Sequence, residues 1–282
     1  MKRKISLAFR KLGLPFLQSP DWILLQSLRK QLANVPRYTK GKVTANGWNL
    51  EYADAPSLVS AVECVVFKRW NDFITDKENP VILDCGANIG VSVIHYKKMF
   101  PKAKITAFEP DHDVCEILRR NLLENDITDV EIVEAAIWKE NGETEFFSEG
   151  ADAGRLDNNE NDIDSLVGKT PKGSKVKVKT VRLAEYIADS PVDFIKLDIE
   201  GAESNVMEDC ADNLSNIKSM VIEFHLTNSR PNELAVVMKA LSDAKFNVSV
   251  NSYGKWINLI NKDSIKHAPV EFDQYLLLNA WH

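Results

Sequence analysis

Cysteine is scarce in this chain, and the cysteines that are present form no paired motif. Among 282 residues, cysteine occurs only at positions 64, 85, 115 and 210, so no CxxC spacing exists. A disulfide-rich scaffold, a zinc knuckle and a thiol redox motif are therefore excluded. Long apolar runs are missing as well, and none approaches the roughly 20 residues that a membrane span needs. Glycine (12) and proline (11) are too few for a collagen-like or low-complexity sequence.

Acidic residues are almost absent from the beginning of the chain, although the net charge is −6. Residues 1–42 hold ten Lys or Arg and one acid, Asp21, whereas the rest holds 25 basic and 40 acidic residues. A nucleic-acid binder carries its basic face on the folded body, so this acidic body argues against a nucleic-acid partner. Residues 1–17 place apolar residues at helical spacing among Lys and Arg, which predicts a basic helix that contacts an anionic membrane. A helix with solvated charges is the alternative. We expect a cytoplasmic protein, with this segment as a peripheral contact to the inner membrane face.

Short apolar runs alternate with helical periods from Pro80 onward. Because most of these runs lack a polar face, they predict a parallel sheet covered by helices on both sides. Strands are expected at 81–85, 105–109, 130–137, 176–181, 193–198, 219–224, 246–250 and 272–280, and helices at 89–99, 114–125, 202–214 and 233–244.

Three segments are expected along the chain. Residues 1–45 form a basic N-terminal helical extension, residues 46–79 a cap of one strand and one helix, and residues 80–282 the main domain. A segment rich in Gly, Asp, Asn and Lys, residues 148–175, interrupts this domain. Long irregular segments in compact domains commonly serve binding, so we expect a substrate loop there.

Two strand ends carry residues suited to a ligand. The first strand runs into Asp84-Cys85-Gly86-Ala87-Asn88-Ile89-Gly90, whose glycines permit a tight turn and close backbone approach. Asn88 breaks the GxGxxG pattern. Because an acid at the strand end, Asp84, precedes the glycine turn, the turn suits a cationic or zwitterionic ligand better than a pyrophosphate. The second strand ends in Phe108-Glu109-Pro110, where the Glu109 carboxylate can accept both hydroxyls of a ribose.

Together these motifs carry a family resemblance. DCGANIG (84–90), AFEP (107–110), KLDIEGAE (196–203) and VIEFH (221–225) resemble the FkbM family of class I S-adenosylmethionine-dependent methyltransferases. The resemblance covers about residues 48–230. It implies an α/β fold with a Rossmann-like seven-stranded sheet, an antiparallel last strand and an N-terminal helical cap.

The resemblance also implies S-adenosylmethionine as cofactor and assigns residues to its parts. The methionine end would lie against the glycine turn, the ribose at the second strand end and the adenine at the third, with Asp198 beside the methyl group and the acceptor. The residues implied for cofactor binding are Asp84, Gly86, Ala87, Asn88, Gly90, Glu109, Pro110, Glu134, Ala135, Ala136 and Asp198.

Methyl transfer to a hydroxyl requires a general base, because a neutral hydroxyl is a poor nucleophile. His225 has the most suitable intrinsic pKa and shares a strand face with Glu223. The other candidates are Asp198, Glu200, Glu203 and Glu223. A divalent metal held by Asp198, Glu223 and His225 stays an open alternative.

The FkbM family is associated with O-methylation, which sets the expected acceptor. We expect methylation of a hydroxyl on a sugar, a glycan or glycolipid, or a natural product. Two alternatives stay open: an NAD(P)-dependent Rossmann oxidoreductase, which Asn88 disfavours, and a membrane-attached binding protein without catalysis. The sequence does not fix the oligomeric state.

Overall fold

A seven-stranded sheet forms the centre of the computed structural model, which describes residues 19–148, 154–156, 173–226, 232–254 and 274–282. The strand order is β12-β13-β11-β10-β3-β4-β5. Every neighbouring pair is parallel except that β13 runs antiparallel to both β11 and β12. The predicted fold class is therefore confirmed. The strands are β3 (Val81–Cys85), β4 (Lys104–Phe108), β5 (Val130–Val133), β10 (Phe194–Leu197), β11 (Ser219–Leu226), β12 (Asn247–Gly254) and β13 (Gln274–Trp281).

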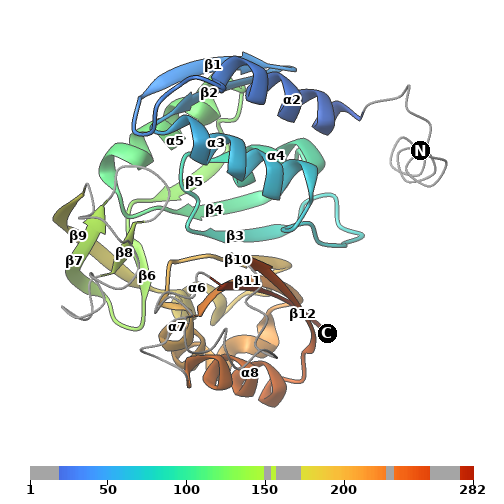
Figure 1. The fold of residues 1–282 in the computed structure, drawn as a ribbon. Coiled ribbons are helices and arrows are strands. Elements are labelled where there is room, and N and C mark those ends of the chain that lie inside the picture. Colours follow the sequence, from blue (N-terminus) through green and yellow to red (C-terminus); the bar gives the residue numbers. More distant parts are fainter. Residues whose placement is uncertain (1–18, 149–153, 157–172, 227–231, 255–273) are drawn as a thin grey trace, which may run out of the picture.

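Helices cover both faces of this sheet, as the apolar strands predicted (Figure 1). The helices α4 (Val91–Met99) and α5 (His112–Glu124) pack on one face within a core that also includes the N-terminal elements. On the opposite face lie α6 (Leu183–Ile187), α7 (Glu203–Asp209) and α8 (Glu233–Asp243) with a second core. The expected helix at 202–214 is shorter, because a 3-10 helix (Ala211–Asn216) follows α7.

The N-terminal elements form a cap over α4 and α5 (Figure 1). Helix α2 (Pro20–Leu32) buries one leucine face, and its N-cap Ser19 accepts a hydrogen bond from the backbone of Trp22. A two-stranded hairpin follows, made of β1 (Gly41–Ala45) and β2 (Trp48–Tyr52). The one helix expected within residues 46–79 is α3 (Ala55–Ala61), which continues as a π-helix (Val62–Phe67).

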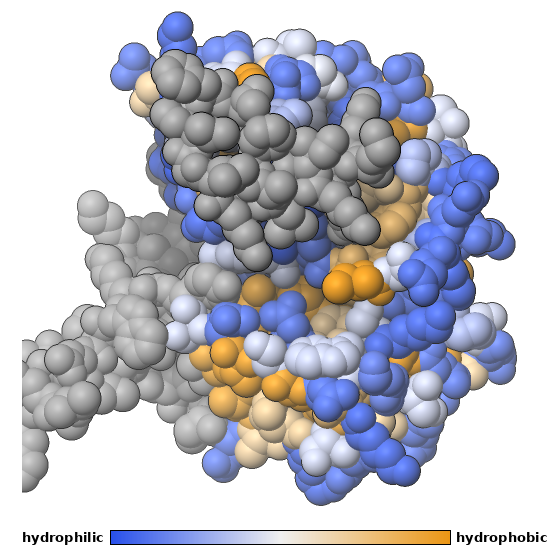
Figure 2. Space-filling view, turned by 90° about the vertical axis from the view of Figure 1, so that its right-hand side faces the viewer, coloured by the Kyte–Doolittle hydropathy of each residue, from blue (hydrophilic) through white to orange (hydrophobic). Residues whose placement is uncertain are grey.

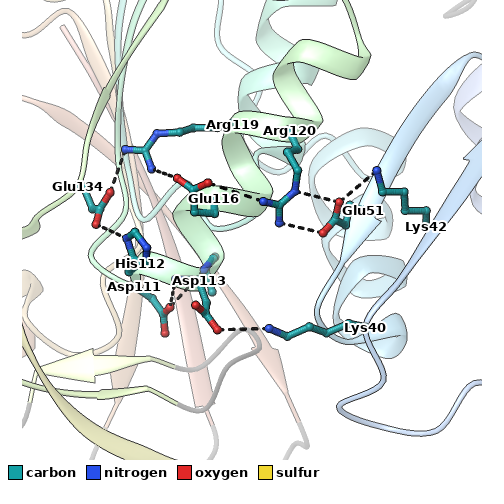
Figure 3. Close-up of polar contacts among 11 residues, drawn as sticks. Lys40, Lys42, Glu51, Asp111, His112, Asp113, Glu116, Arg119, Arg120 and Glu134 are labelled. Atoms are coloured by element: carbon teal, nitrogen blue, oxygen red, sulfur yellow. Dashed lines mark hydrogen bonds and ion pairs between the residues drawn. The ribbon is translucent and has the colours of Figure 1, made fainter.

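The hairpin is attached to helix α5 by polar contacts (Figure 3). Glu51 accepts two hydrogen bonds from Arg120, at 2.9 and 3.1 Å, and Lys42 lies 3.4 Å from the same carboxylate. The Asn121 amide donates to the backbone carbonyl of Glu51 at 2.9 Å. This hairpin spans residue 45, at which the sequence placed a boundary, and the division into three segments stays a prediction.

The expected strand at 130–137 is wrong in one respect, because it divides between two sheets. β5 ends at Val133, and β6 (Ala136–Trp138) begins a separate four-stranded sheet of order β6-β9-β7-β8. A turn at Glu134, in which the Ala135 amide donates to the Val133 carbonyl at 2.9 Å, redirects the chain. The other strands are β7 (Gly142–Ser148), β8 (Arg155–Leu156) and β9 (Ser174–Arg182), so part of the expected loop 148–175 is sheet.

The surface carries scattered apolar groups among charged ones, as Figure 2 shows for one face. Within the described ranges, no helix combines the length and the apolar character that crossing a bilayer requires. The expected membrane contact through residues 1–17 lies outside the described residues.

Candidate functional site

A pocket lies at the carboxyl ends of β3, β4 and β10, where the strand order of the main sheet reverses. Open α/β sheets bind their ligands at such a position. The pocket encloses about 690 Å³ of empty space, part of it open to solvent. Seven of the residues expected to bind a cofactor line it: Gly86, Asn88, Glu109, Pro110, Ala135, Ala136 and Asp198.

The glycine turn after β3 forms one wall of this pocket. Gly86 has a φ of +83°, and a Cβ atom there would lie 1.9 Å from the backbone oxygen of Asp198. Only glycine therefore permits this contact between the two strand ends. Gly90 (φ +90°) begins α4, where a Cβ would lie 2.5 Å from Leu118 of α5. Gly90 thus serves helix packing and, like the buried Ala87, lies behind the wall.

Glu109 directs a carboxylate to the pocket from the end of β4. Its Oε2 accepts a hydrogen bond from the Asn88 backbone N–H and its Oε1 from that of Asp111, each at 2.9 Å. Burial raises the pKa of Glu109 to about 7, although both backbone bonds oppose the rise. Each oxygen has a further lone pair, so the carboxylate can accept two hydroxyl groups from a ligand.

Asp84 is buried behind the pocket and does not line it. Its carboxylate accepts a 2.5 Å hydrogen bond from Ser92 and lies 3.6 Å from the ammonium group of Lys196. Burial raises the pKa of Asp84, and Lys196 opposes this rise. Asp84, one of the residues that the family resemblance implies for cofactor binding, therefore lies behind the residues that line the pocket.

Glu134 is likewise not among the residues that line the pocket, and Figure 3 shows its carboxylate directed toward His112 and Arg119. Its carboxylate pairs with His112 at 2.7 Å and with Arg119 at 2.9 Å, both on α5. The two alanines that follow it line the pocket instead. Small side chains there leave room for a flat ring system against an apolar wall that includes Phe108 and Phe146.

The five candidate bases lie after β10, at the start of α7 and in the second half of β11. His225 lies between two carboxylates, with Nε2 3.1 Å from Glu200 and Nδ1 3.2 Å from Glu203. Burial lowers the pKa of His225, but the two carboxylates outweigh it and hold the pKa well above its usual range. The Asp198 charge and burial raise the pKa of Glu223 to about 8. Of these five residues, Asp198 and Glu200 line the pocket.

A cation could bind at this cluster only with a changed ligand set. One possible ligand atom from each of Asp198, Glu200 and His225 lies within 4.8 Å of the other two. This set contains Glu200 in place of Glu223, which the sequence suggested as a ligand. However, both ring nitrogens of His225 face carboxylates. Metal binding would require His225 to be neutral and to give up one of these contacts.

Sequence reasoning missed several residues that build this site. Asp111 lines the pocket and caps α5, where it accepts backbone hydrogen bonds from Asp113 and Val114. Its signal was present as a helix-capping acid directly after the strand end. Other residues that line the pocket and were not predicted are Phe108, Val114, Ile137, Leu156 and Ile199.

Comparisons with known proteins give a family match over most of the main domain. The profile of the methyltransferase FkbM domain matches residues 84–260. The chain is 27% identical over 165 residues to 2-O-methyltransferase NoeI of Sinorhizobium fredii, which covers 54% of this chain and 65% of the relative. It is 31% identical over 155 residues to methyltransferase sdnD of Sordaria araneosa, covering 46% and 60%. The chain thus spans about three fifths of the length of the curated relatives it matches.

Solved structures align more distantly. A SAM-dependent methyltransferase from Agrobacterium tumefaciens aligns with a TM-score of 0.47 at 10% identity, covering 89% of this chain and 72% of that chain. TYW2 of M. jannaschii, solved with AdoMet, aligns with a TM-score of 0.45 at 13% identity, covering 87% and 86%.

Proposed function

Because the chain belongs to the methyltransferase FkbM domain family, we propose that it is an S-adenosylmethionine-dependent O-methyltransferase. The observation that supports this most is the Glu109 carboxylate, which lines the pocket with each oxygen held by one backbone N–H. Such a fixed acceptor pair suits the two adjacent hydroxyls of a ribose. S-adenosylmethionine carries that ribose between an adenine and a positively charged methionine end.

The pocket residues fit the parts of this cofactor. Gly86 and Asn88 would hold the methionine end, because the glycine turn brings backbone atoms to the pocket wall. Ala135 and Ala136 would lie against the adenine. Asp198 would lie near the sulfonium group, whose positive charge a carboxylate complements. When bound, the cofactor supplies an electrophilic methyl group.

The acceptor proton needs a carboxylate of this chain. Asp198 and Glu200 are placed to take it, because they line the pocket. We propose that His225 and Glu203 act through Glu200, since His225 bridges the two glutamates. Glu223, with a pKa of about 8, holds a proton at neutral pH and would contribute as a base only above that value. The residues would thus supply orientation, which can lower a barrier by about 7–11 kcal/mol, and proton removal.

The acceptor is proposed to be a hydroxyl on a sugar, a glycan or glycolipid, or a natural product. The printed name of the relative NoeI, a 2-O-methyltransferase, supports transfer to oxygen. A screen of glycan and lipid acceptors with radiolabelled S-adenosylmethionine would identify the acceptor class. Incorporation into protein or nucleic acid alone would contradict the proposal.

Calorimetry separates this function from its alternatives. We expect micromolar binding of S-adenosylmethionine and S-adenosylhomocysteine and no binding of NAD. Binding of NAD alone would favour an oxidoreductase. Cofactor binding without transfer to any acceptor in the screen would favour a binding protein, and absence of both cofactor interactions would reject the proposed function.

A further inference from the structure

Lys196 is a buried cation in the middle of the main sheet, next to the pocket. It lies on β10 within the strand Phe194–Leu197, all four residues of which are buried. Its side chain is 6% exposed. An isolated ammonium group at such a position is strongly unfavourable, so interactions with its partners must offset the free energy of the lost hydration.

The partners of Lys196 come from three places around the pocket. Its Nζ donates to the Gly86 carbonyl at 2.8 Å and lies 3.0 Å from the Asp198 carboxylate. The fully buried Asp84 carboxylate lies 3.6 Å away on β3. One ammonium group therefore joins the glycine turn, the buried strand acid and the acid that lines the pocket.

Two of these contacts concern the geometry of the pocket rather than the core. Gly86 lies so near the backbone of Asp198 that a Cβ atom on it would be 1.9 Å from the Asp198 backbone oxygen, and both residues line the pocket. The bond to Lys196 fixes one oxygen of Asp198, Oδ2, so that the side chain has a defined direction. With Asp84 and Asp198 ionised, the three groups carry a formal charge of −1, which complements one positive charge on a ligand.

We propose that Lys196 is a positioning residue of this pocket, which orients the Asp198 carboxylate and the Gly86 turn toward a ligand that carries a sulfonium charge. This rests on the proposed function, because the ligand class comes from it. Lys196 touches no ligand itself in this proposal. Its effect is exerted through Asp198 and Gly86.

A purely structural role of Lys196 predicts a different experimental result. If Lys196 only neutralised the buried Asp84, then removing both charges together would restore stability and leave the pocket intact. If Lys196 also orients Asp198 and Gly86, removing both charges would restore stability but not ligand affinity. A pair of variants distinguishes the two roles.

The experiment compares Lys196→Met with the double variant Asp84→Asn/Lys196→Met, using thermal melting and calorimetry with S-adenosylmethionine and S-adenosylhomocysteine. Lys196→Met leaves Asp84 buried without its cation and should melt at a lower temperature. The double variant keeps the formal charge of −1 and should recover most of that stability. We expect the double variant to bind S-adenosylmethionine at least tenfold more weakly than wild type. The loss of affinity should be smaller for S-adenosylhomocysteine, because its sulfur carries no charge.

Wild-type affinity in the double variant would overturn the proposal, and so would equal losses for the two ligands. Lys97→Met is the matched control, because Lys97 is also buried and pairs with Asp129 and the Ala103 carbonyl away from the pocket. It should lose stability and keep wild-type affinity. Failure of the wild type to bind either ligand would reject the proposed function itself, so the two failures are distinguishable.

Discussion

Replacing Glu109 with Gln tests the central contact of the proposed cofactor site. The carboxylate accepts backbone hydrogen bonds from Asn88 and Asp111 through different oxygens, each at 2.9 Å. A Gln side chain has only one accepting oxygen, so its NH₂ group would face one of these N–H groups. One buried N–H group is then left unsatisfied in the free and in the bound protein alike, which lowers stability. Binding loses the acceptor for one ribose hydroxyl, at a cost of about 1–3 kcal/mol. Affinity should therefore decrease by about 5- to 150-fold.

The pH dependence of binding provides an independent signature of Glu109. Its pKa of about 7 means that only about a tenth is ionised at pH 6. Because the ionised form accepts both ribose hydroxyls, wild-type affinity for S-adenosylhomocysteine should rise about tenfold between pH 6 and a plateau near pH 8. The Gln variant cannot titrate and should lack this component of the rise.

Stability without ligand should change in the opposite direction. The pKa of Glu109 in the folded protein, about 7, lies above the ordinary value of 4.5, so the folded state holds the proton more tightly. This contribution is present at low pH and is lost as pH rises from about 4.5 to 7, by about 3 kcal/mol. Relative to wild type, the Gln variant should therefore gain stability over this range.

Calorimetry at pH 6, 7 and 8 and urea denaturation at pH 5 and 7 measure these effects. Glu131→Gln is the control, because Glu131 is exposed on neighbouring β5 and its carboxylate bonds only Thr106 among the contacts described. An unchanged affinity and an unchanged pH profile in Glu109→Gln would refute the ribose assignment.

Four further predictions concern the turn, the acid cluster, metal dependence and the basic segment. Gly86→Ala should weaken cofactor binding at least tenfold, because the new Cβ would lie 1.9 Å from the backbone oxygen of Asp198. Gly47→Ala is the control, because Gly47 also has a positive φ but a Cβ there would meet no atom within 4 Å. Calorimetry should show wild-type affinity for this control. His225→Gln should lower stability by roughly 3 kcal/mol below pH 6.5, because Glu200 and Glu203 lose their cation. Since folding raises the pKa of His225, the loss of stability in this variant should become smaller at higher pH. A loss of stability that stays constant with pH in denaturant unfolding would contradict the role of the ion pairs. Chelation with EDTA should leave turnover unchanged, because both His225 nitrogens face carboxylates, and recovery of lost activity by Mg²⁺ or Mn²⁺ would assign the cluster to a metal. Deleting residues 1–17 should reduce binding to anionic vesicles and not to neutral ones, and equal sedimentation of both forms would remove the membrane role.

The fold and the family were predictable because they depend on local regularities. Apolar runs of strand length mark the centre of a parallel sheet whatever their partners are, and the strand ends then fall at one edge. DCGANIG and KLDIEGAE lie at two of these ends, and the family match over residues 84–260 confirms the resemblance drawn from them. The turn at Glu134 was not predictable, because VEIVEAAI is equally apolar on both sides of the point where the chain changes sheets.

The sequence predicts where each site residue lies along the chain better than it predicts which way the side chain points. Asp84 and Glu134 both stand at strand ends, yet one is buried beside Ser92 and the other pairs with α5. Which way a strand-end carboxylate faces depends on cations supplied by distant segments, such as Lys196, 112 residues after Asp84, and these are brought together only by the fold.

Charged residues within apolar strands were the informative signal that sequence analysis did not use. The run Phe194-Ile195-Lys196-Leu197 lacks a polar face except for one lysine, and a lysine is almost never fully buried unless it is paired. Such a lysine therefore implies at least one buried acid on a neighbouring strand, and Asp84 on β3 was the acid in the corresponding register. Since a buried pair adds little stability compared with apolar residues, its presence beside a pocket is better explained by what it holds in place. The same reasoning applies to His225 between Glu200 and Glu203, because Lys196 and His225 each contact a carboxylate that lines the pocket.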